Sequence, residues 1–210
     1  MVPKIHLVIA HPNTNSFNHA LAEQALKIAA DNSLTIVKTD LYSFARHQHP
    51  AVQFYGQQEY PQQQINEEQQ KIKDSDIVIL QFPLYWFSYP AILQAYLEQI
   101  WQVDFAYPPT FEQSPLAKLN KKVLFSITTQ SPKSAYTDQG KNGDIQRILF
   151  PMTTAFRFVG FAILEPFICY AIGNKNKQEL EECMSEHYQH INQMLVNPKI
   201  IMQANAPIFI

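Results

Sequence analysis

The ten-residue stretch QFPLYWFSYP, from Gln81 to Pro90, is unusually aromatic: its five rings are Phe82, Tyr85, Trp86, Phe87 and Tyr89. Pro83 and Pro90 interrupt any continuous strand or helix, so we expect a loop. Loops are normally polar, because exposed rings are poorly solvated. Several rings in one loop can instead bind a flat ligand, since each stacked pair adds about 0.5–1.5 kcal/mol beyond burial. The alternative is that these rings fill the core, the commoner role of loop aromatics.

A second candidate is the polar segment HPNTNS (11–16), which follows a short apolar run. Ser16 is placed to cap a helix that begins at Phe17. The amides of Phe17 and Asn18 then lie at the positive end of the helix dipole, an arrangement that binds phosphate without glycine or lysine. His11 can add a hydrogen bond or a charge. The alternative is that Ser16 merely caps the helix and His11 merely ends a strand.

A third polar loop, TTQSPKSAYTDQGKNGD (128–144), is rich in hydroxyls and turn-forming residues. Most such segments are solvated connections, and that is the alternative here. Its position after a predicted strand is what makes it a candidate for ligand binding.

Other chemistries have less support from the residues. Cys183, His187 and His190 share one face of the last predicted helix at i, i+4 and i+7, as ligands of a metal could. Glutamates crowd the same helix, so we expect a solvated amphipathic helix and no metal. The five glycines include no Gly-x-Gly pair and no Gly-Lys-Ser/Thr, so dinucleotide and P-loop fingerprints are absent.

Alternating strands and helices position these loops. Buried-strand patterns cover 4–10, 34–39, 76–82, 121–128 and part of 161–172, and helical patterns cover 17–32, 65–73, 90–102, 144–158 and 176–195. This alternation predicts an α/β domain, residues 1–210, with a five-stranded parallel sheet and helices on both faces. In the flavodoxin-like version the order is 2-1-3-4-5, and ligands bind at the carboxyl ends of strands one and three. The first two loops lie there. We expect the segment 45–64 to be a loop packed on the body.

Composition narrows the class of protein further. The chain has 210 residues, 46% of them hydrophobic, and a formal charge of −2, which does not favour nucleic-acid binding. No apolar run is long enough for a membrane span, and we expect no signal peptide. The two cysteines have no Cys-x-x-Cys spacing, which fits a reducing cytoplasm.

Several segments together resemble the NAD(P)H:quinone oxidoreductases of the DT-diaphorase type. They run in order from Ile5 to about Gly173, and they are HPNTNSFNHAL, DSDIVILQFPLYWFSYPAILQAYLEQIW, FAY, SITT, AYTDQGKNGD and GFAILEPFICYAIG. The resemblance implies a flavodoxin-like homodimer that binds FAD, or alternatively FMN. It implies two-electron hydride transfer from NAD(P)H through the flavin to a quinone.

The resemblance also implies roles for individual residues. His11, Phe17 and Asn18, next to the cap Ser16, match positions that hold the flavin phosphates, and Gln69 matches a further cofactor contact. Nine further residues match positions that form the wall and the polar edge of the flavin ring site. They are Pro83, Leu84, Tyr85, Trp86, Phe87, Thr128, Thr129, Gln130 and Ser131. Trp86 and Phe87, with Tyr107 from the partner subunit, match rings that enclose nicotinamide or quinone.

Two positions depart from the family pattern. Gln130 and Ser131 stand where the family usually has two glycines, so side chains could crowd the flavin edge or the backbone could need a positive φ. Tyr136 matches a catalytic tyrosine that donates a hydrogen bond near N1 and O2 of the flavin. The histidine that usually accompanies it aligns with Asn142, which has no proton to give near neutral pH.

Other functions remain alternatives to quinone reduction. An open flavin face accepts many oxidants, so a nitro- or azo-compound reductase is the rival within the class. A non-catalytic flavoprotein, such as a regulatory subunit of an ion transporter, is the rival from another class. The length of the chain, the 45–64 excursion and Gln69 favour FAD over FMN. The apolar helix after Pro90 favours a two-fold homodimer.

Overall fold

The structure is a computed structural model and describes residues 3–44, 60–110 and 112–197. Its sheet is parallel and has the order β2-β1-β3-β4-β5, as the alternation of strands and helices predicts. The strands are β1 (Lys4–Ile9), β2 (Thr35–Asp40), β3 (Ile77–Pro83), β4 (Lys122–Thr128), β5 (Ala162–Ile163) and β6 (Phe167–Cys169). Every residue of β3 and β4 is buried, which explains their nearly continuous apolar sequences.

The predicted fifth strand is split in two. β5 pairs with the start of β4 and β6 pairs with its end, both in parallel. Glu165 and Pro166 lie between the two pieces, and Pro166 has no amide to continue the ladder. The sheet therefore has the predicted order, with a sixth short strand in place of the end of the fifth.

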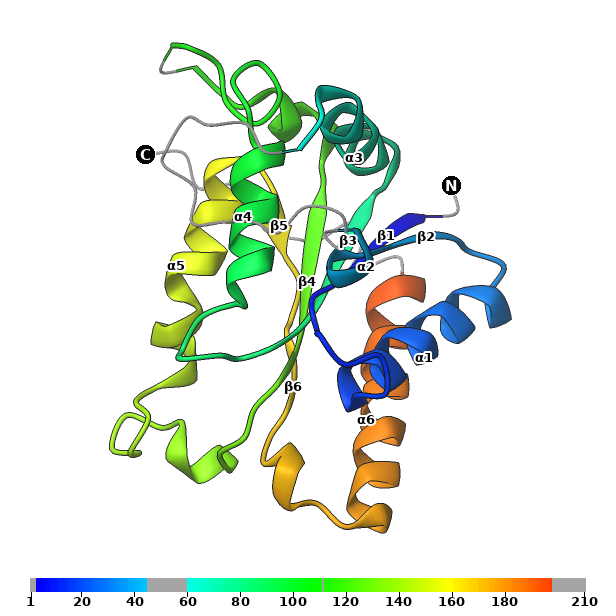
Figure 1. The fold of residues 1–210 in the computed structure, drawn as a ribbon, viewed down its shortest axis with the longest axis vertical. Coiled ribbons are helices and arrows are strands. Elements are labelled where there is room, and N and C mark those ends of the chain that lie inside the picture. Colours follow the sequence, from blue (N-terminus) through cyan, green and yellow to red (C-terminus); the bar gives the residue numbers. More distant parts are fainter. Residues whose placement is uncertain (1–2, 45–59, 111, 198–210) are drawn as a thin grey trace.

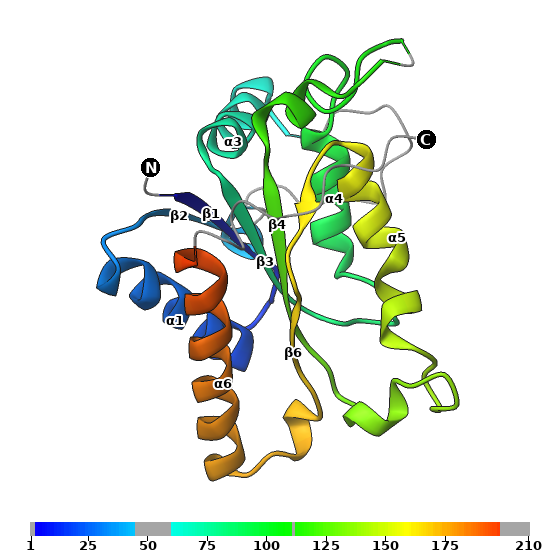
Figure 2. The ribbon, with the colours of Figure 1, turned by 180° about the vertical axis from the view of Figure 1, so that it is seen from behind.

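Helices cover both faces of the sheet (Figures 1 and 2). On one face lie α1 (Phe17–Asp31) and α6 (Lys177–Val196), and on the other lie α2 (Leu41–Phe44), α3 (Gln62–Asp74), α4 (Ala91–Ile100) and α5 (Ile145–Phe158). Short 3-10 turns occupy Pro115–Leu119, Lys133–Ala135 and Ile172–Asn174. The first face buries Leu7, Ile79 and Leu124 beneath α1 and α6. The second buries Leu80 and Phe125 beneath α4 and α5.

The residues proposed for a metal site have other partners. Cys183, on α6, is disulfide-bonded to Cys169 at the end of β6, a link that the spacing of the cysteines does not indicate. His187 Nδ1 lies 2.6 Å from Gln24 Oε1, and His190 Nε2 lies 2.8 Å from the carbonyl oxygen of Glu165. Within the described ranges no group of three potential ligands gathers.

A buried polar cluster joins β1, β2, α3 and α4 on the second face. Glu68 accepts hydrogen bonds from Tyr96 at 2.9 Å and from Thr39 at 3.0 Å. His6 Nε2 lies 3.0 Å from Thr39 Oγ1 and 3.6 Å from Glu68 Oε2. Burial lowers the pKa of His6 to about 4, although the negative charge of Glu68 acts in the opposite direction. His6 is therefore neutral at pH 7.

Two sequence expectations can be compared only in part with the structure. Most of the 45–64 excursion lies outside the described residues, which resume at Tyr60. Among the described helices, none combines the length and apolar character that crossing a membrane requires.

Candidate active site at the carboxyl edge of the sheet

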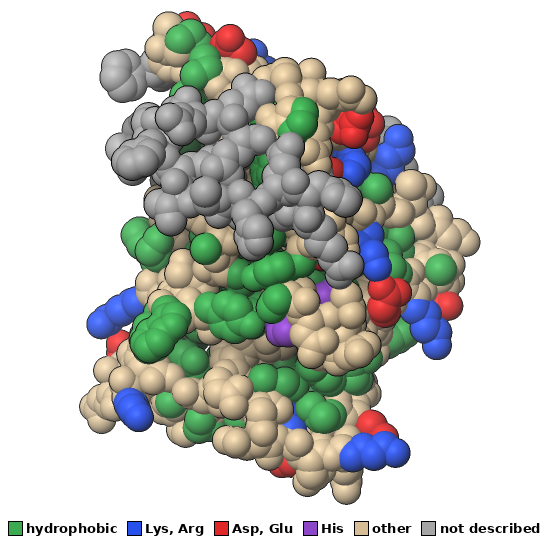
Figure 3. All heavy atoms as spheres, viewed as in Figure 1, with side chains coloured by type: hydrophobic (Ala, Val, Ile, Leu, Met, Phe, Trp, Pro, Cys, Tyr) green, Lys and Arg blue, Asp and Glu red, His purple; other side chains and the backbone are tan. Residues whose placement is uncertain are grey.

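Three loops leave adjacent strands at one edge of the sheet. They follow β1, β3 and β4, which lie side by side in the observed order. The loops after β3 and β4 are joined directly, because the Leu84 amide donates to the Thr128 carbonyl at 2.8 Å. Figure 3 shows hydrophobic side chains gathered near histidine side chains on this face of the molecule. The edge thus combines apolar and polar groups, as the strand order predicts.

The start of α1 has the geometry of an anion site. The Ser16 side chain accepts a hydrogen bond from the His19 amide at 3.3 Å, which confirms Ser16 as the N-cap. In an α-helix each amide donates to the carbonyl four residues earlier. For Phe17 and Asn18 that carbonyl lies before the helix begins, so neither amide has a hydrogen-bond partner within the helix. These two amides, at the positive end of the dipole, can bind a phosphate.

His11 stands beside this helix start as a neutral group. Its Nδ1 lies 3.1 Å from both the amide nitrogen and the carbonyl oxygen of Asn13, and its ring meets that of His19 edge-on with centroids 6.2 Å apart. Burial lowers the pKa of His11; a hydrogen bond to the Asn13 carbonyl acts in the opposite direction, and the proximity of His19 lowers the pKa by a smaller amount. At neutral pH His11 therefore offers a hydrogen bond rather than a positive charge.

The side chain of Asn18 points into the protein rather than toward the loop. Its Nδ2 donates to Thr128 Oγ1 at 2.9 Å, and its Oδ1 accepts from Gln81 Nε2 at 2.8 Å. Asn18, Gln81 and Thr128 are all buried. Only the backbone amide of Asn18 is thus left for a ligand, and its side chain ties α1 to β3 and β4.

The aromatic loop is a tight turn with an unfavourable backbone. Tyr85 and Ser88 exchange two backbone hydrogen bonds, at 2.9 and 3.0 Å. The two residues between them, Trp86 and Phe87, have φ of +48° and +63°, the signs of a type I′ turn. Trp86 is 93% exposed and Phe87 49%. A bulky residue costs about 1–2 kcal/mol in this left-handed region, and such strain concentrates at functional sites. The turn holds its rings out from the sheet edge instead of filling the core.

The loop after β4 is well braced. The Thr129 amide donates to the Cys169 carbonyl at 2.9 Å, and Thr129 Oγ1 donates to the Ser131 carbonyl at 2.9 Å. Neither Gln130 nor Ser131 has a positive φ, so the backbone does not need the glycines of the family pattern. The side-chain amide of Gln130 instead lies against Gly173. A β-carbon at position 173 would come within 2.1 Å of Gln130 Nε2. Gly173 thereby makes room for Gln130.

Tyr136 lies in the same loop and is buried. Its ring packs on Tyr170 with centroids 5.7 Å apart. Burial, followed by the effect of Tyr136, raises the pKa of Tyr170. The Asn142 amide donates to the Ala135 carbonyl at 2.8 Å and closes the loop around Tyr136. This closure brings positions 136 and 142 into one compact turn.

Two predicted site residues lie elsewhere in the chain. Gln69, on α3, donates to the Ile100 carbonyl at 2.9 Å, at the far end of α4. Because α4 has ten residues it is about 15 Å long, so this contact is remote from the loop that precedes the helix. Tyr107 belongs to the segment after Ile100, the last residue of α4, and its carbonyl accepts a hydrogen bond from the Asp104 amide at 2.8 Å. A single chain therefore does not bring Gln69 to Trp86.

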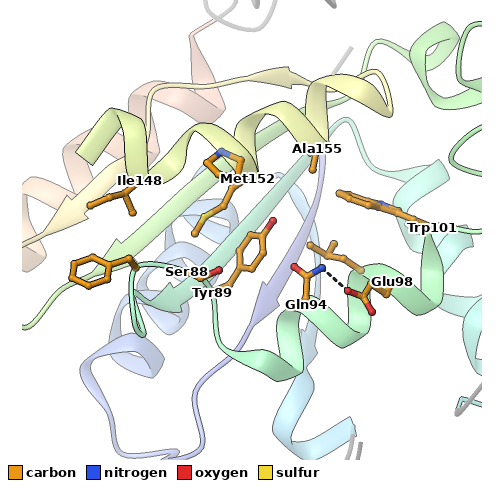
Figure 4. A pocket seen from close by; sticks show the side chains of 11 residues that line it. Ser88, Tyr89, Gln94, Glu98, Trp101, Ile148, Met152 and Ala155 are labelled. Carbon is orange, nitrogen blue, oxygen red and sulfur yellow. Dashed lines mark hydrogen bonds between the residues drawn. The ribbon is translucent and has the colours of Figure 1, made fainter. Parts of the chain in front are cut away.

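A cavity of about 270 Å³ opens beside the aromatic turn, between α4 and α5. Phe87 and Tyr89 line it from the turn, Trp101 from the end of α4, and Met152 from α5. Figure 4 shows the side chains of the two helices facing each other across it. Burial raises the pKa of Tyr89 to about 12, so its hydroxyl stays protonated. The cavity extends the apolar surface away from the turn.

Three residues of this edge are not among the predicted site residues: Gln81, Tyr170 and Gly173. Gln81 had a visible signal, a polar side chain within the otherwise apolar run IVILQFP. Tyr170 and Gly173 had none, because their contacts form only when the end of the sheet packs against the loop after β4.

The fold and the edge define a parallel α/β protein in which a helix start suited to an anion lies at the same sheet edge as a turn with exposed rings. Residues 3–194 match the model of the family described as Flavodoxin-like fold. The chain is 35% identical over 190 residues to rat (Rattus norvegicus) NAD(P)H dehydrogenase (quinone) 1, covering 80% of this chain and 69% of that protein. It is 34% identical over 189 residues to human (Homo sapiens) ribosyldihydronicotinamide dehydrogenase (quinone), covering 80% and 81%.

A solved structure agrees in fold. A protein described as a putative quinone reductase from Klebsiella pneumoniae superposes with a TM-score of 0.76 at 22% identity, covering 92% of this chain and 85% of that one. The chain therefore belongs to the flavodoxin-like family and, within it, to the NAD(P)H:quinone oxidoreductases. It is an oxidoreductase.

Proposed function

We propose that the chain is a flavin-dependent NAD(P)H:quinone oxidoreductase. The observation that carries the proposal is the meeting of an anion-binding helix start and an exposed aromatic turn at one sheet edge. A flavin nucleotide joins a phosphate to a flat tricyclic ring, so a single ligand satisfies both features. The names of the two relatives, each a dehydrogenase that acts with a quinone, support this function.

The groups at this edge are of the kinds that a flavin would need. The amides of Phe17 and Asn18 would hold the phosphate, with His11 as a neutral hydrogen-bonding group. Leu84 to Phe87, following Pro83, would form the wall of the ring site. Along the polar edge of the ring would lie Thr128, Thr129, Gln130 and Ser131. When bound, the flavin supplies hydride transfer from NAD(P)H to the quinone.

Tyr136 would stabilise negative charge at the ring edge. Its hydroxyl can donate a hydrogen bond there, and donors aimed at developing charge lower the barrier of a reaction. Asn142 can donate a hydrogen bond as well, but its amide does not titrate. We therefore assign Tyr136 the hydrogen-bonding role, without a histidine as proton store.

The site would be completed by a second copy of the chain. Trp86 precedes α4 and Tyr107 follows it, and a two-fold homodimer would bring Tyr107 of the partner subunit against Trp86 and Phe87. The apolar cavity beside the turn and two exposed rings on α5, Phe150 and Phe158, support an interface on this side. Light scattering should give twice the 24.2 kDa mass of one chain, and a single-chain mass for the active enzyme would contradict the dimer.

Oxidation of NADPH with menadione as acceptor tests the activity. We expect turnover well above that of free flavin at the same concentration. Turnover equal to free flavin, with flavin still bound, would instead identify a non-catalytic flavoprotein. Acid release of the cofactor followed by chromatography separates FAD, which we favour, from FMN.

An azo- or nitro-compound reductase is the second candidate function. The observation in its favour is the 93% exposure of Trp86, which leaves a ring site open to acceptors of many shapes. Ratios of kcat/KM for menadione, an azo dye and a nitroarene, measured with one NADPH concentration, decide between the two. A higher ratio for the dye or the nitroarene would replace quinone as the assigned acceptor.

A further inference from the structure

Gln81 is a buried amide in an apolar strand, and its position needs an explanation. It is 1% exposed and lies between Leu80 and Phe82 in β3. Burying an amide without hydrogen bonds costs at least about 1–3 kcal/mol, so such a residue is stable only where it is paired. Both its side chain and its backbone are paired, and the two partners flank one loop.

The partners of Gln81 stand at the two ends of the β1–α1 loop. Its carbonyl accepts from the Ala10 amide at 3.0 Å, just before His11. Its side chain donates to Asn18 Oδ1 at 2.8 Å, in the first turn of α1. One residue of the central sheet thus clamps the beginning and the end of the loop that carries the anion-binding amides.

The hydrogen bonds that begin at Gln81 continue toward the aromatic turn. Asn18 Nδ2 donates to Thr128 Oγ1 at 2.9 Å, and the Thr128 carbonyl accepts from the Leu84 amide at 2.8 Å. This chain of bonds runs from the helix start to the residue that precedes the aromatic turn. It therefore sets the position of the phosphate-binding end relative to the ring-binding end.

We propose that Gln81 is a positioning residue for the phosphate of the bound flavin: by orienting Asn18, it holds the amides of Phe17 and Asn18 where the phosphate binds. This inference rests on the proposed function. Gln81 itself touches no ligand and acts only through Asn18. Its loss should weaken binding of flavins that carry a phosphate and spare riboflavin, which has the same ring and no phosphate.

The test compares Gln81→Met, which keeps length and removes the amide, with the wild-type protein. Flavin-free protein is titrated with FMN, FAD and riboflavin, and the dissociation constants are read from flavin fluorescence. We expect Gln81→Met to raise the constants for FMN and FAD about tenfold, as loss of a buried hydrogen bond does, and that for riboflavin less than about twofold.

Ser126→Ala is the matched control. Ser126 is the β4 neighbour of Gln81 in the sheet and is fully buried, and its Oγ has no hydrogen-bond partner among the described residues. Its removal should leave all three constants unchanged. Asn18→Leu, which removes the side-chain partner of Gln81 and keeps the backbone amide at position 18, gives a second route should Gln81→Met fail to fold. It should reproduce the selective loss.

The outcomes separate this inference from the proposed function. Equal weakening of all three flavins would make Gln81 a merely structural residue, and no weakening would remove its role; either overturns the inference while quinone reduction stands. Wild-type protein that binds no flavin at all would overturn both.

Discussion

Replacing Trp86 by glycine should stabilise the protein relative to replacing it by alanine. Trp86 has φ of +48° and is 93% exposed, so neither variant loses much buried surface. The two variants differ only in the β-carbon, which is unfavourable in the left-handed region and absent in glycine. The comparison therefore isolates the strain of the aromatic turn.

The magnitude follows from two opposing effects. The left-handed backbone costs a residue with a β-carbon about 1–2 kcal/mol. Glycine gives the unfolded chain extra freedom, which costs about 0.4–1 kcal/mol. The difference leaves Trp86→Gly more stable than Trp86→Ala by about 0.5–1 kcal/mol.

Ser88 provides a control in the same turn. It is exposed and its φ is not positive, so only the unfolded-state effect applies. Ser88→Gly should be less stable than Ser88→Ala by about 0.4–1 kcal/mol, the opposite sign. Urea unfolding of flavin-free protein is the assay, because bound ligand would add its own stabilisation.

The predicted stability difference between the glycine and alanine variants has opposite signs at positions 86 and 88. The same sign at both positions, or equal stability of the two Trp86 variants, would refute a left-handed turn. The stable glycine variant should also bind riboflavin more weakly than wild type, since the ring is gone. Strain that lowers stability and improves binding is expected where a loop serves a ligand. Unchanged riboflavin affinity of Trp86→Gly would show that the aromatic turn does not contact the flavin ring.

Three further predictions concern pH, the loop after β4 and the reaction. Because His6 has a pKa of about 4 when folded and 6.5 when unfolded, the unfolded state binds more protons between these values. Stability should therefore fall by up to about 3 kcal/mol on acidification through this window, and urea titrations of His6→Asn should lack that part. Gly140→Ala should unfold at lower urea than Gly143→Ala: a β-carbon at 140 would lie 2.4 Å from the Ala135 carbonyl oxygen, whereas one at 143 meets nothing within 4 Å and adds only the backbone strain of a φ of +78°. Equal midpoints would contradict this packing. In stopped-flow experiments Tyr136→Phe should slow flavin reduction by at most about 10²–10³-fold, and an unchanged rate would remove Tyr136 from the mechanism. Asn142→His should add a pH dependence near neutrality.

Much of the fold could be predicted from local patterns. The buried runs at β1, β3 and β4 and the Ser16 cap depend on residues close together in the sequence. The strand order then follows from the alternation of strands and helices, and it correctly places the three loops at one edge. Pro166, which interrupts the fifth strand, was also visible in the sequence, and the single predicted strand was wrong there.

The missed features depend on distant contacts or on backbone that the local sequence disfavours. Gln81 meets Asn18 across 63 positions, and Asn18 meets Thr128 across 110. No periodicity reports such pairs. A type I′ turn is normally signalled by glycine or asparagine, and Trp86 and Phe87 give the opposite signal. The prediction therefore found the rings but not the turn that exposes them.

The backbone explains where this chain can depart from its family and where it cannot. Gln130, Ser131 and Asn142 all have φ outside the left-handed region, so side chains are tolerated at these positions. Trp86 and Phe87 have left-handed backbone conformations, which cost glycine less free energy than a residue with a β-carbon, yet both residues are bulky. Left-handed backbone is thus present at the exposed rings and absent where the sequence departs from the family pattern. Differences in the preferred acceptor should therefore arise from side chains at 130, 131 and 142 on an unchanged loop backbone.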